Sequence, residues 1–348
     1  RTPRALHAMT STTDRTPLRM AAWPLLISVL AVPACGILSH APKDTIVVNG
    51  QAIPNPYKNV VLVLHCRLPM FLTKTGNICA ERRPLYAGYT RYFGEMIWLT
   101  RDECKAGPDE PYRCLSKIME EKGDRDGLFY MHFDALIRPA QFALTFDKNS
   151  MACFGKEDTC PLLPDGLLSN CSWGPWNQVR AEQFRTALST IQKSGVKELA
   201  KFNMDTVHIG MDDLFYIPSR NFELYRTMAS AFSKNAVHHE AAGPTMRKIL
   251  QEVTRIPDTN MSCTGSCCKH LGAELALNED FRCGHAFELK DKATQRAFRK
   301  ALAMDRQRLS VKDELSAEDE AELSVDAEAG QVQGTLEDLA RIINELTA

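Results

Sequence analysis

The chain has 348 residues, is 44% hydrophobic and is nearly neutral, with 42 basic residues against 43 acidic ones. A chain of this length can form one large domain or two smaller ones, with a sizeable core. The charge balance argues against a nucleic-acid partner, because no basic excess is present to neutralise phosphates.

The first predicted element is an apolar segment from Met20 to Leu38, which contains no charged residue and follows Arg15 and Arg19. Its length just suffices to span a bilayer. Basic residues before it predict a cytoplasmic tail, residues 1–19, and a lumenal body. A cleaved signal peptide is the alternative, since Val32-Pro33-Ala34 offers small residues at cleavage positions. We therefore expect a signal-anchor or a signal peptide over residues 20–38.

Residues 39–57 are polar and contain prolines, so we expect a linker that leads into a folded body over residues 58–305. Three apolar runs in this body are typical of buried strands. A helical spacing of apolar residues lies between the second and third runs and ends at Gly123. The runs are Asn59 to Cys66, Tyr92 to Thr100 and Gly127 to Ile137. This alternation predicts an α/β fold, with a mixed, mostly parallel sheet flanked by helices.

The second half of the body continues with an amphipathic helix from Arg180 to Leu199 and a strand candidate from Thr206 to Pro218. Ser219 is then expected to cap a helix whose apolar residues share one face. Residues 306–348 are strongly acidic, which predicts a solvated helical or disordered tail outside the core.

Twelve cysteines favour an oxidising, secretory compartment. Two glycosylation sequons, at Asn170 and Asn260, agree with that compartment. Disulfide-tied loops are therefore expected around Cys153 to Trp176 and Cys263 to Cys283. Zinc is the alternative for the second segment, although its ligand spacing matches no common finger. The possible zinc ligands are Cys263, Cys267, Cys268, His270, Cys283 and His285.

The sequence DGLFYMHFDALIRP places Asp134 where a predicted strand ends and a loop begins. Ligands of open α/β sheets bind beyond the carboxyl ends of strands. A carboxylate there can bind Mg²⁺ or Mn²⁺, which also binds phosphate oxygens. His132 shares a face with Asp134 on a regular strand. The alternative is a structural aspartate that stabilises the following turn.

A second pair of carboxylates, Asp212 and Asp213, lies in the sequence GMDDLFYIPSRNF. Neighbouring residues of a strand point to opposite faces, so only one of the two can face a given site. A carboxylate beside a sugar acceptor could remove its hydroxyl proton as a general base. Stabilisation of the turn after Gly210 is the alternative.

Three motifs occur in the order VVLVLHC, DGLFYMHFDALIRP and DDLFYIPSRNFELY. Together they resemble the glycosyltransferase-like proteins of the STELLO type, over roughly Asn59 to Phe232. The resemblance implies a GT-A nucleotide-diphospho-sugar fold and type II anchoring in the Golgi. It also implies that Asp134 holds the metal and that Asp213 takes the place of the later aspartate. One departure is His132, which stands where such enzymes usually have an aspartate, and a histidine suits Mn²⁺ better than Mg²⁺.

The resemblance also implies that His65, after the first strand, contacts a nucleotide and that His239 is a late metal ligand. The function that follows is transfer of a sugar from a nucleotide-sugar to a glycan or protein acceptor in the secretory pathway, with Asp213 or Asp212 as base. Two alternatives remain. One is a non-catalytic GT-A-like binding or scaffolding protein of the Golgi, and the other is a secreted, disulfide-rich binding protein.

Overall fold

A computed structural model describes residues 42–48, 50–66, 79–100, 110–155, 157–162, 181–203, 205–265 and 269–309. The predicted anchor, residues 20–38, and most of the predicted acidic tail lie outside these ranges. Within them, no helix is both long enough and apolar enough to cross a membrane.

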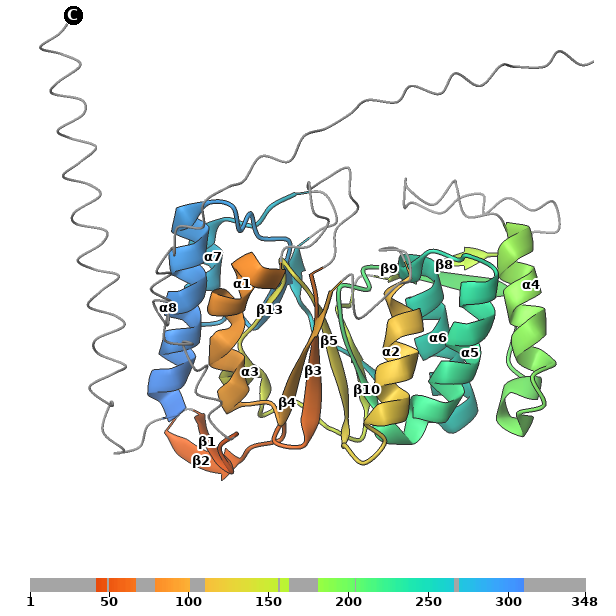
Figure 1. The fold of residues 1–348 in the computed structure, drawn as a ribbon, viewed down its shortest axis with the longest axis horizontal. Coiled ribbons are helices and arrows are strands. Elements are labelled where there is room, and N and C mark those ends of the chain that lie inside the picture. The colour runs from red at the N-terminus through yellow and green to blue at the C-terminus, as the bar shows by residue number, and fades with distance from the viewer. Residues whose placement is uncertain are drawn as a thin grey trace, which may run out of the picture. The chain divides into compact units, whose positions relative to one another are not determined.

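A six-stranded sheet forms the centre of the described part of the chain (Figure 1). Its strands, in spatial order, are β11 (Asp258–Asn260), β7 (Met151–Cys153), β10 (Leu214–Pro218), β5 (Gly127–His132), β3 (Val60–His65) and β4 (Glu95–Leu99). The pairs β3–β4, β3–β5 and β7–β11 are parallel, and β10 is antiparallel to both of its neighbours. Five of these six strands therefore run in one direction, as expected for a mixed, mostly parallel sheet.

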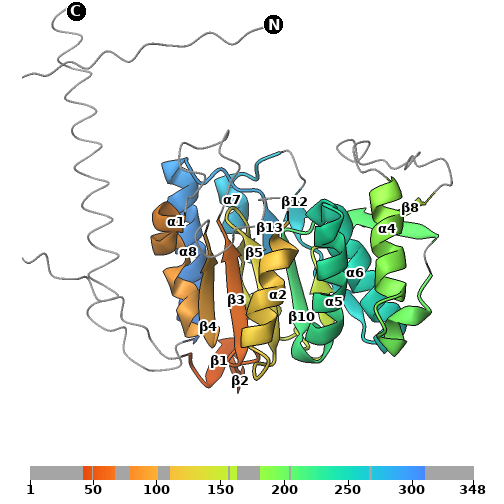
Figure 2. The ribbon, with the colours of Figure 1, turned by 45° about the vertical axis from the view of Figure 1, so that its right-hand side comes forward.

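Helices cover both faces of this sheet. The central strands are largely apolar on both faces, and the helices bury these side chains away from water. Helices α2, α5, α6 and α4 lie on one side, and α1, α3, α7 and α8 on the other (Figures 1 and 2). The first group is α2 (Pro111–Glu121), α4 (Ala181–Gln192), α5 (Phe222–Lys234) and α6 (His239–Thr254). The second group is α1 (Cys79–Tyr86), α3 (Pro139–Phe142), α7 (Ala273–Ala276) and α8 (Lys292–Leu309).

Alternate residues of the strands divide the core into two clusters. Val61 and Val63 of β3 pack toward α2 and α5, whereas Leu62 and Leu64 pack toward α1 and α8. This alternation follows from the two-residue period of side chains along a strand. The continuous apolar run of β3 is therefore explained by burial on both faces, and the prediction of a central strand is confirmed.

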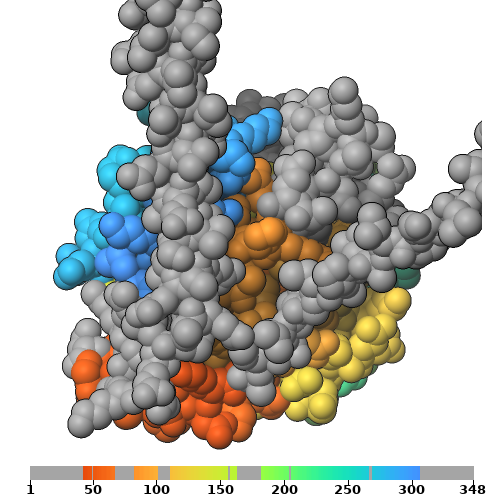
Figure 3. Space-filling view, turned by 60° about the vertical axis from the view of Figure 1, so that its left-hand side comes forward, coloured from red at the N-terminus to blue at the C-terminus, as the bar shows by residue number. Residues whose placement is uncertain are grey.

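Two small sheets and a hairpin complete the fold. The hairpin packs against α8 and α3, and it forms the red patch at the lower left of Figure 3. The hairpin is β1 (Thr45–Val48) with β2 (Gln51–Pro54). One small sheet is β8 (Glu157–Pro161) with β9 (Thr206–Gly210). The other small sheet is β12 (Thr264–Gly265), β13 (Cys283–His285) and β6 (Leu136–Ile137). Ile46 of the hairpin is fully buried, so the folded body includes part of the stretch that was predicted to be a linker.

Three sequence-based predictions of elements need correction. The single strand predicted over Thr206 to Pro218 is two strands, β9 and β10, and the aspartates lie in the connection between them. The helix predicted to reach Leu199 ends at Gln192, and a separate 3-10 turn, Lys197–Ala200, follows Gly195, whose φ is +85°. Ser219 does not cap a helix, because it begins a 3-10 turn, Ser219–Asn221, that precedes α5.

One of the two expected disulfide-tied loops, Cys263 to Cys283, is present in the described segments. Most of the other, Cys153 to Trp176, lies outside the described residues. Cys263 and Cys283 form a disulfide that ties β12 to β13. Cys66, Cys114 and Cys160 are disulfide-bonded as well. Cys153 is free and buried. The disulfide reading of the segment from Cys263 to Cys283 is therefore confirmed for its first and last cysteines, which excludes these two as zinc ligands.

Candidate functional site

The carboxyl ends of β3 and β5 meet at one edge of the central sheet. From β3 the chain passes to β4, which lies on one side of β3 in the sheet, and it then returns to β5 on the other side of β3. The connections that follow β3 and β5 therefore diverge. Open α/β sheets bind ligands where the connections of neighbouring strands diverge in this way. His65 and His132 end the two strands and pair in register, with ring centroids 5.5 Å apart. The end of the β3–β5 pair is therefore the place where the topology predicts a ligand.

Asp213 reaches this edge because β10 runs antiparallel to β5. Leu214, the first residue of β10, pairs with Met131, so the preceding residue lies beside the last residue of β5. The backbone N–H of His132 donates a hydrogen bond to the carbonyl oxygen of Asp213 at 2.8 Å. The side chains are also close, with His132 Nδ1 at 3.8 Å from Asp213 Oδ1.

His285 comes from the far end of the chain, on the short strand β13. This strand pairs with β6, directly after the turn that holds Asp134, and Phe287 N–H donates to Asp134 O at 2.9 Å. The parallel strand β12 lies very close to His285. A Cβ on Gly265, whose φ is +133°, would lie 1.5 Å from the carbonyl oxygen of His285, so only glycine fits there.

Two histidines bracket the carboxylate of Asp134. Its Oδ1 lies 2.9 Å from His132 Nδ1 and 3.0 Å from His285 Nε2. The other nitrogen of His285, Nδ1, lies 3.7 Å from Asp213 Oδ2. Only 8% of Asp134, 5% of Asp213 and 6% of His285 is exposed. This buried arrangement of two carboxylates and two imidazoles is the candidate metal and ligand site.

The charges in this site are strongly coupled. Burial alone would lower the pKa of His285, but Asp213 and Asp134 outweigh burial and raise it to about 9. Burial alone would raise the pKa of Asp134, but His285 and His132 together hold it well below its usual range. Without a cation His285 is therefore positively charged at neutral pH, with a proton on each ring nitrogen. A cation that binds one of these nitrogens must displace the proton on it.

The geometry fits a divalent cation. One ligand atom from each of His132, Asp213 and His285 can be chosen so that all three lie within 4.8 Å of one another. A cation about 2.1 Å from each ligand atom puts those atoms roughly 3–4 Å apart. His132 Nδ1 lies 3.8 Å from Asp213 Oδ1, and His285 Nδ1 lies 3.7 Å from Asp213 Oδ2. Each imidazole is therefore at such a separation from one oxygen of the carboxylate, though not from the same oxygen. Asp213 Oδ2 and His285 Nδ1 are buried and have no hydrogen-bond partner among the residues that the structure describes.

In this arrangement Asp134 supports the ligands as well as being a candidate ligand itself. A histidine that binds a metal through one nitrogen usually donates its other N–H to a carboxylate, which fixes the ring. His285 Nε2 and Asp134 Oδ1 have this relation, while His285 Nδ1 faces Asp213. Two imidazoles with carboxylates suit Mn²⁺ or a later transition metal better than Mg²⁺.

The start of α6 borders the same site. His239 and Glu240 can each place a ligand atom within 4.8 Å of one another and of Asp213. His238 caps the helix and accepts a hydrogen bond from Glu240 N–H at 3.4 Å. The two histidines therefore follow α5 in the sequence and stand at the N-terminus of α6.

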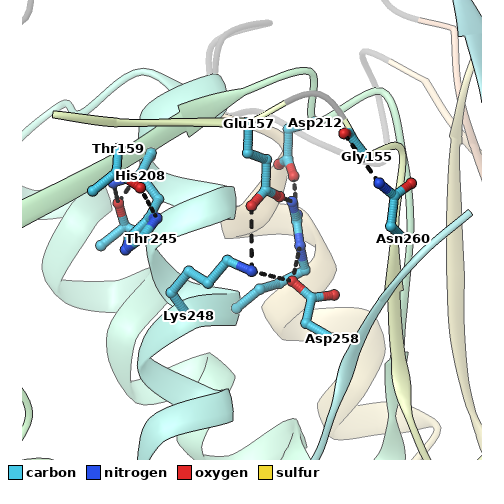
Figure 4. Close-up of polar contacts among 10 residues, drawn as sticks. Gly155, Glu157, Thr159, His208, Asp212, Thr245, Lys248, Asp258 and Asn260 are labelled. Carbon is cyan, nitrogen blue, oxygen red and sulfur yellow. Dashed lines mark hydrogen bonds and ion pairs between the residues drawn. The ribbon is translucent and has the colours of Figure 1, made fainter. Parts of the chain in front are cut away.

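Asp212 points away from the site, into a buried ion cluster on the other side of the connection. Its carboxylate bonds with Arg247 of α6, which is 1% exposed and also bonds with Glu157. Arg247 Nε lies 3.4 Å from Asp258, and Lys248 lies 3.6 Å from both Glu157 and Asp258. Figure 4 shows Glu157, Asp212, Lys248 and Asp258 directed toward one another.

The ion cluster holds three carboxylates against two cationic side chains. Burial raises the pKa of Asp212 to about 7, although Arg247 beside it acts in the opposite direction. Gly243 makes this packing possible, because a Cβ there would lie 1.8 Å from Asp212 Oδ2. Asp212 therefore anchors the connection before β10, while its neighbour Asp213 faces the candidate site.

The structure brings four of the predicted site residues together: His132, Asp134, Asp213 and His239. His65 borders them through the ring of His132, and its Nδ1 lies 2.7 Å from the hydroxyl of Tyr130. Asp212 is not in the site, which agrees with the expectation that only one of the two aspartates can face it. From the sequence alone His285 is a candidate only for zinc, because it stands two residues after Cys283.

A comparison with protein-family models finds no matching family, and a comparison with curated proteins finds no similar sequence. The assignment of function therefore rests on the fold and the site.

Proposed function

We propose that the protein is a metal-dependent glycosyltransferase with a GT-A-type fold. It would transfer a sugar from a nucleotide-sugar to a glycan or protein acceptor. The observation that carries this proposal is the cluster of His132, Asp134, Asp213 and His285 at the end of the β3–β5 pair, where a nucleotide diphosphate and its cation would bind.

The residues of the site have separate tasks in this proposal. A divalent cation, Mn²⁺ in preference to Mg²⁺, would neutralise the negative charge that develops on the departing diphosphate. His132, Asp213 and His285 would hold it, with Asp134 as a ligand or as the group that orients both imidazoles. The nucleotide would lie along the ends of β3 and β5, next to His65.

Neither of the two adjacent aspartates is well placed to act as the catalytic base in this proposal. Asp212 is poorly suited, because it is 1% exposed and bonded to Arg247. Asp213 lies between two imidazoles, and that position favours cation binding over removal of a proton from an acceptor.

The disulfide between Cys263 and Cys283 supports an oxidising compartment. A lumenal location in the Golgi or endoplasmic reticulum, with residues 20–38 as anchor, is part of the proposal, and secretion is its alternative. The nearest alternative in function is a non-catalytic protein of the same architecture. One observation favours it, namely that Asp134 is already bonded to both histidines.

Calorimetric titration with UDP and GDP, with and without Mn²⁺, tests the proposal. We expect nucleotide binding that requires Mn²⁺ and that weakens at least about 10-fold in Asp134→Asn. Asp124→Asn is the matched control, because Asp124 is exposed and lies outside the site. Donor turnover, followed as release of the nucleoside diphosphate, then separates an enzyme from a binding protein. Mn²⁺-independent binding, or an unchanged affinity in Asp134→Asn, would argue against the proposal.

A further inference from the structure

Two sets of possible metal ligands share one carboxylate in this site. The first set is His132, Asp213 and His285, and the second is Asp213, His239 and Glu240. In each set the ligand atoms lie within 4.8 Å of one another. The two sets come from different elements, because the first lies at the ends of β5 and β13 and the second at the start of α6. Asp213 lies between them.

The carboxylate of Asp213 is placed to serve both sets. Its two oxygens face different imidazoles, with Oδ1 3.8 Å from His132 and Oδ2 3.7 Å from His285. The residue is only 5% exposed, and within the described ranges Oδ2 has no hydrogen-bond partner. A buried carboxylate oxygen without a partner is costly unless a cation or a donor satisfies it. Both of these imidazoles belong to the first set, so a cation in that set would take one oxygen of Asp213 and leave the other for a cation in the second set.

We infer that the site binds two divalent cations bridged by Asp213, one held with His132 and His285 and the other held with His239 and Glu240. Carboxylate-bridged pairs of this kind have their metal ions about 3.5–4 Å apart. Each cation would have three protein ligands and would keep open positions for water or phosphate oxygens.

The electrostatics of the site support a second positive ion. Three carboxylates gather here, those of Asp134, Asp213 and Glu240. Within the described part of the chain, the ion pairs of Asp134 and Asp213 are with histidines alone. The N-terminus of α6 opposes a cation with a partial charge of about one half. That partial charge is smaller than the negative charge of a single carboxylate. Two divalent cations carry four positive charges against the three carboxylates, so hydroxide or phosphate oxygens at the open positions would supply the remaining negative charge.

The inference deepens the proposed function and rests on it for the identity of the ligand. Two adjacent cations with open positions match a diphosphate, since each can bind oxygens of one or both phosphates. The nucleoside diphosphate part of a donor is the chemical class that this site would recognise. The metal content itself can be measured without any nucleotide.

The test is equilibrium dialysis of the full chain against Mn²⁺ alone, with elemental analysis of the bound metal. We expect two ions per chain in the wild type. Glu240→Gln and His239→Ala should each retain only the ion held with His132 and His285. His285→Ala should retain only the ion held with His239 and Glu240. The control is His270→Ala, which removes an exposed histidine that pairs with Glu288 and should change nothing. Circular dichroism checks that each variant is folded.

Electron paramagnetic resonance of the Mn²⁺-bound wild type provides a second readout that needs no variant. Two ions bridged by Asp213 should show exchange coupling, and a single ion should not. The inference would be overturned by one ion per chain or by no bound ion. It would also be overturned by two uncoupled ions whose number is unaffected in Glu240→Gln. Donor turnover with a single bound ion would refute the two-cation site alone. Two coupled ions without nucleotide binding would refute the proposed function alone.

Discussion

Replacement of Arg247 by methionine should strongly destabilise the protein. Arg247 is 1% exposed, and it is the centre of an ion cluster with Asp212, Glu157 and Asp258. Methionine would retain much of the packing over the ring of Phe215 but none of the charge. Three carboxylates would then remain with Lys248 as their only cationic partner in the cluster.

The expected cost follows from the burial of these charges. Loss of one partner from a buried ion pair destabilises a protein by about 3–5 kcal/mol, because the remaining charge is left uncompensated. That loss is a large part of a typical stability of about 5–15 kcal/mol. With a urea dependence of about 3 kcal/mol per molar, the unfolding midpoint should fall by about 1–1.7 M.

The assay is urea unfolding of the disulfide-intact protein, followed by circular dichroism. The matched control is Arg226→Met, because Arg226 pairs with Glu120 at 2.8 Å at the surface, where the two side chains are 36% and 64% exposed. An exposed pair contributes about 0–1 kcal/mol. A midpoint shift in Arg247→Met no larger than in Arg226→Met would refute the argument from burial.

Two further predictions concern the same region. Gly243→Ala should lower the free energy of unfolding by about 1–3 kcal/mol, since its Cβ would lie 1.8 Å from Asp212 Oδ2. The control Gly123→Ala, whose Cβ would meet no described atom within 4 Å, should be neutral or slightly stabilising. Equal effects of the two substitutions in urea unfolding would contradict this prediction. Cys153 should resist alkylation by iodoacetamide at pH 8, because burial raises its pKa to about 12. The thiolate fraction is then about 1 in 10,000, and it rises only as the pH approaches 12. Peptide mapping should find Cys153 labelled only after unfolding, and rapid labelling of the native protein would show that the thiol is accessible and ionised.

The sequence was sufficient to predict the central strands, because their information is local. The run from Val60 to Leu64 is apolar throughout, and burial on both faces of a sheet requires such a run. The same reasoning put Asp134 at the end of a strand, and strand direction then puts it at the edge where ligands bind. The local pattern of apolar residues therefore predicts a candidate site at the end of this strand.

The partners of Asp134 could not be predicted in the same way. His285 is distant in the sequence and reaches the site through the pairing of β13 with β6 and the disulfide at Cys283. Disulfide pairing cannot be deduced from the cysteine positions alone. Helix α6 was also missed, since Gly243 and Pro244 in its first turns resemble signals for a loop. Both cases depend on contacts between distant segments.

Helix α6 connects the two charged clusters through a single face. His239, Gly243 and Arg247 are spaced by four residues, so they lie one above the other along the helix. His239 lies beside Asp213, Gly243 allows close contact with Asp212, and Arg247 bonds with Asp212. The adjacent aspartates thus have opposite tasks. Asp212 is neutralised by a fixed guanidinium and anchors the connection to the helix, which leaves the carboxylate of Asp213 held in place and free to bind a cation.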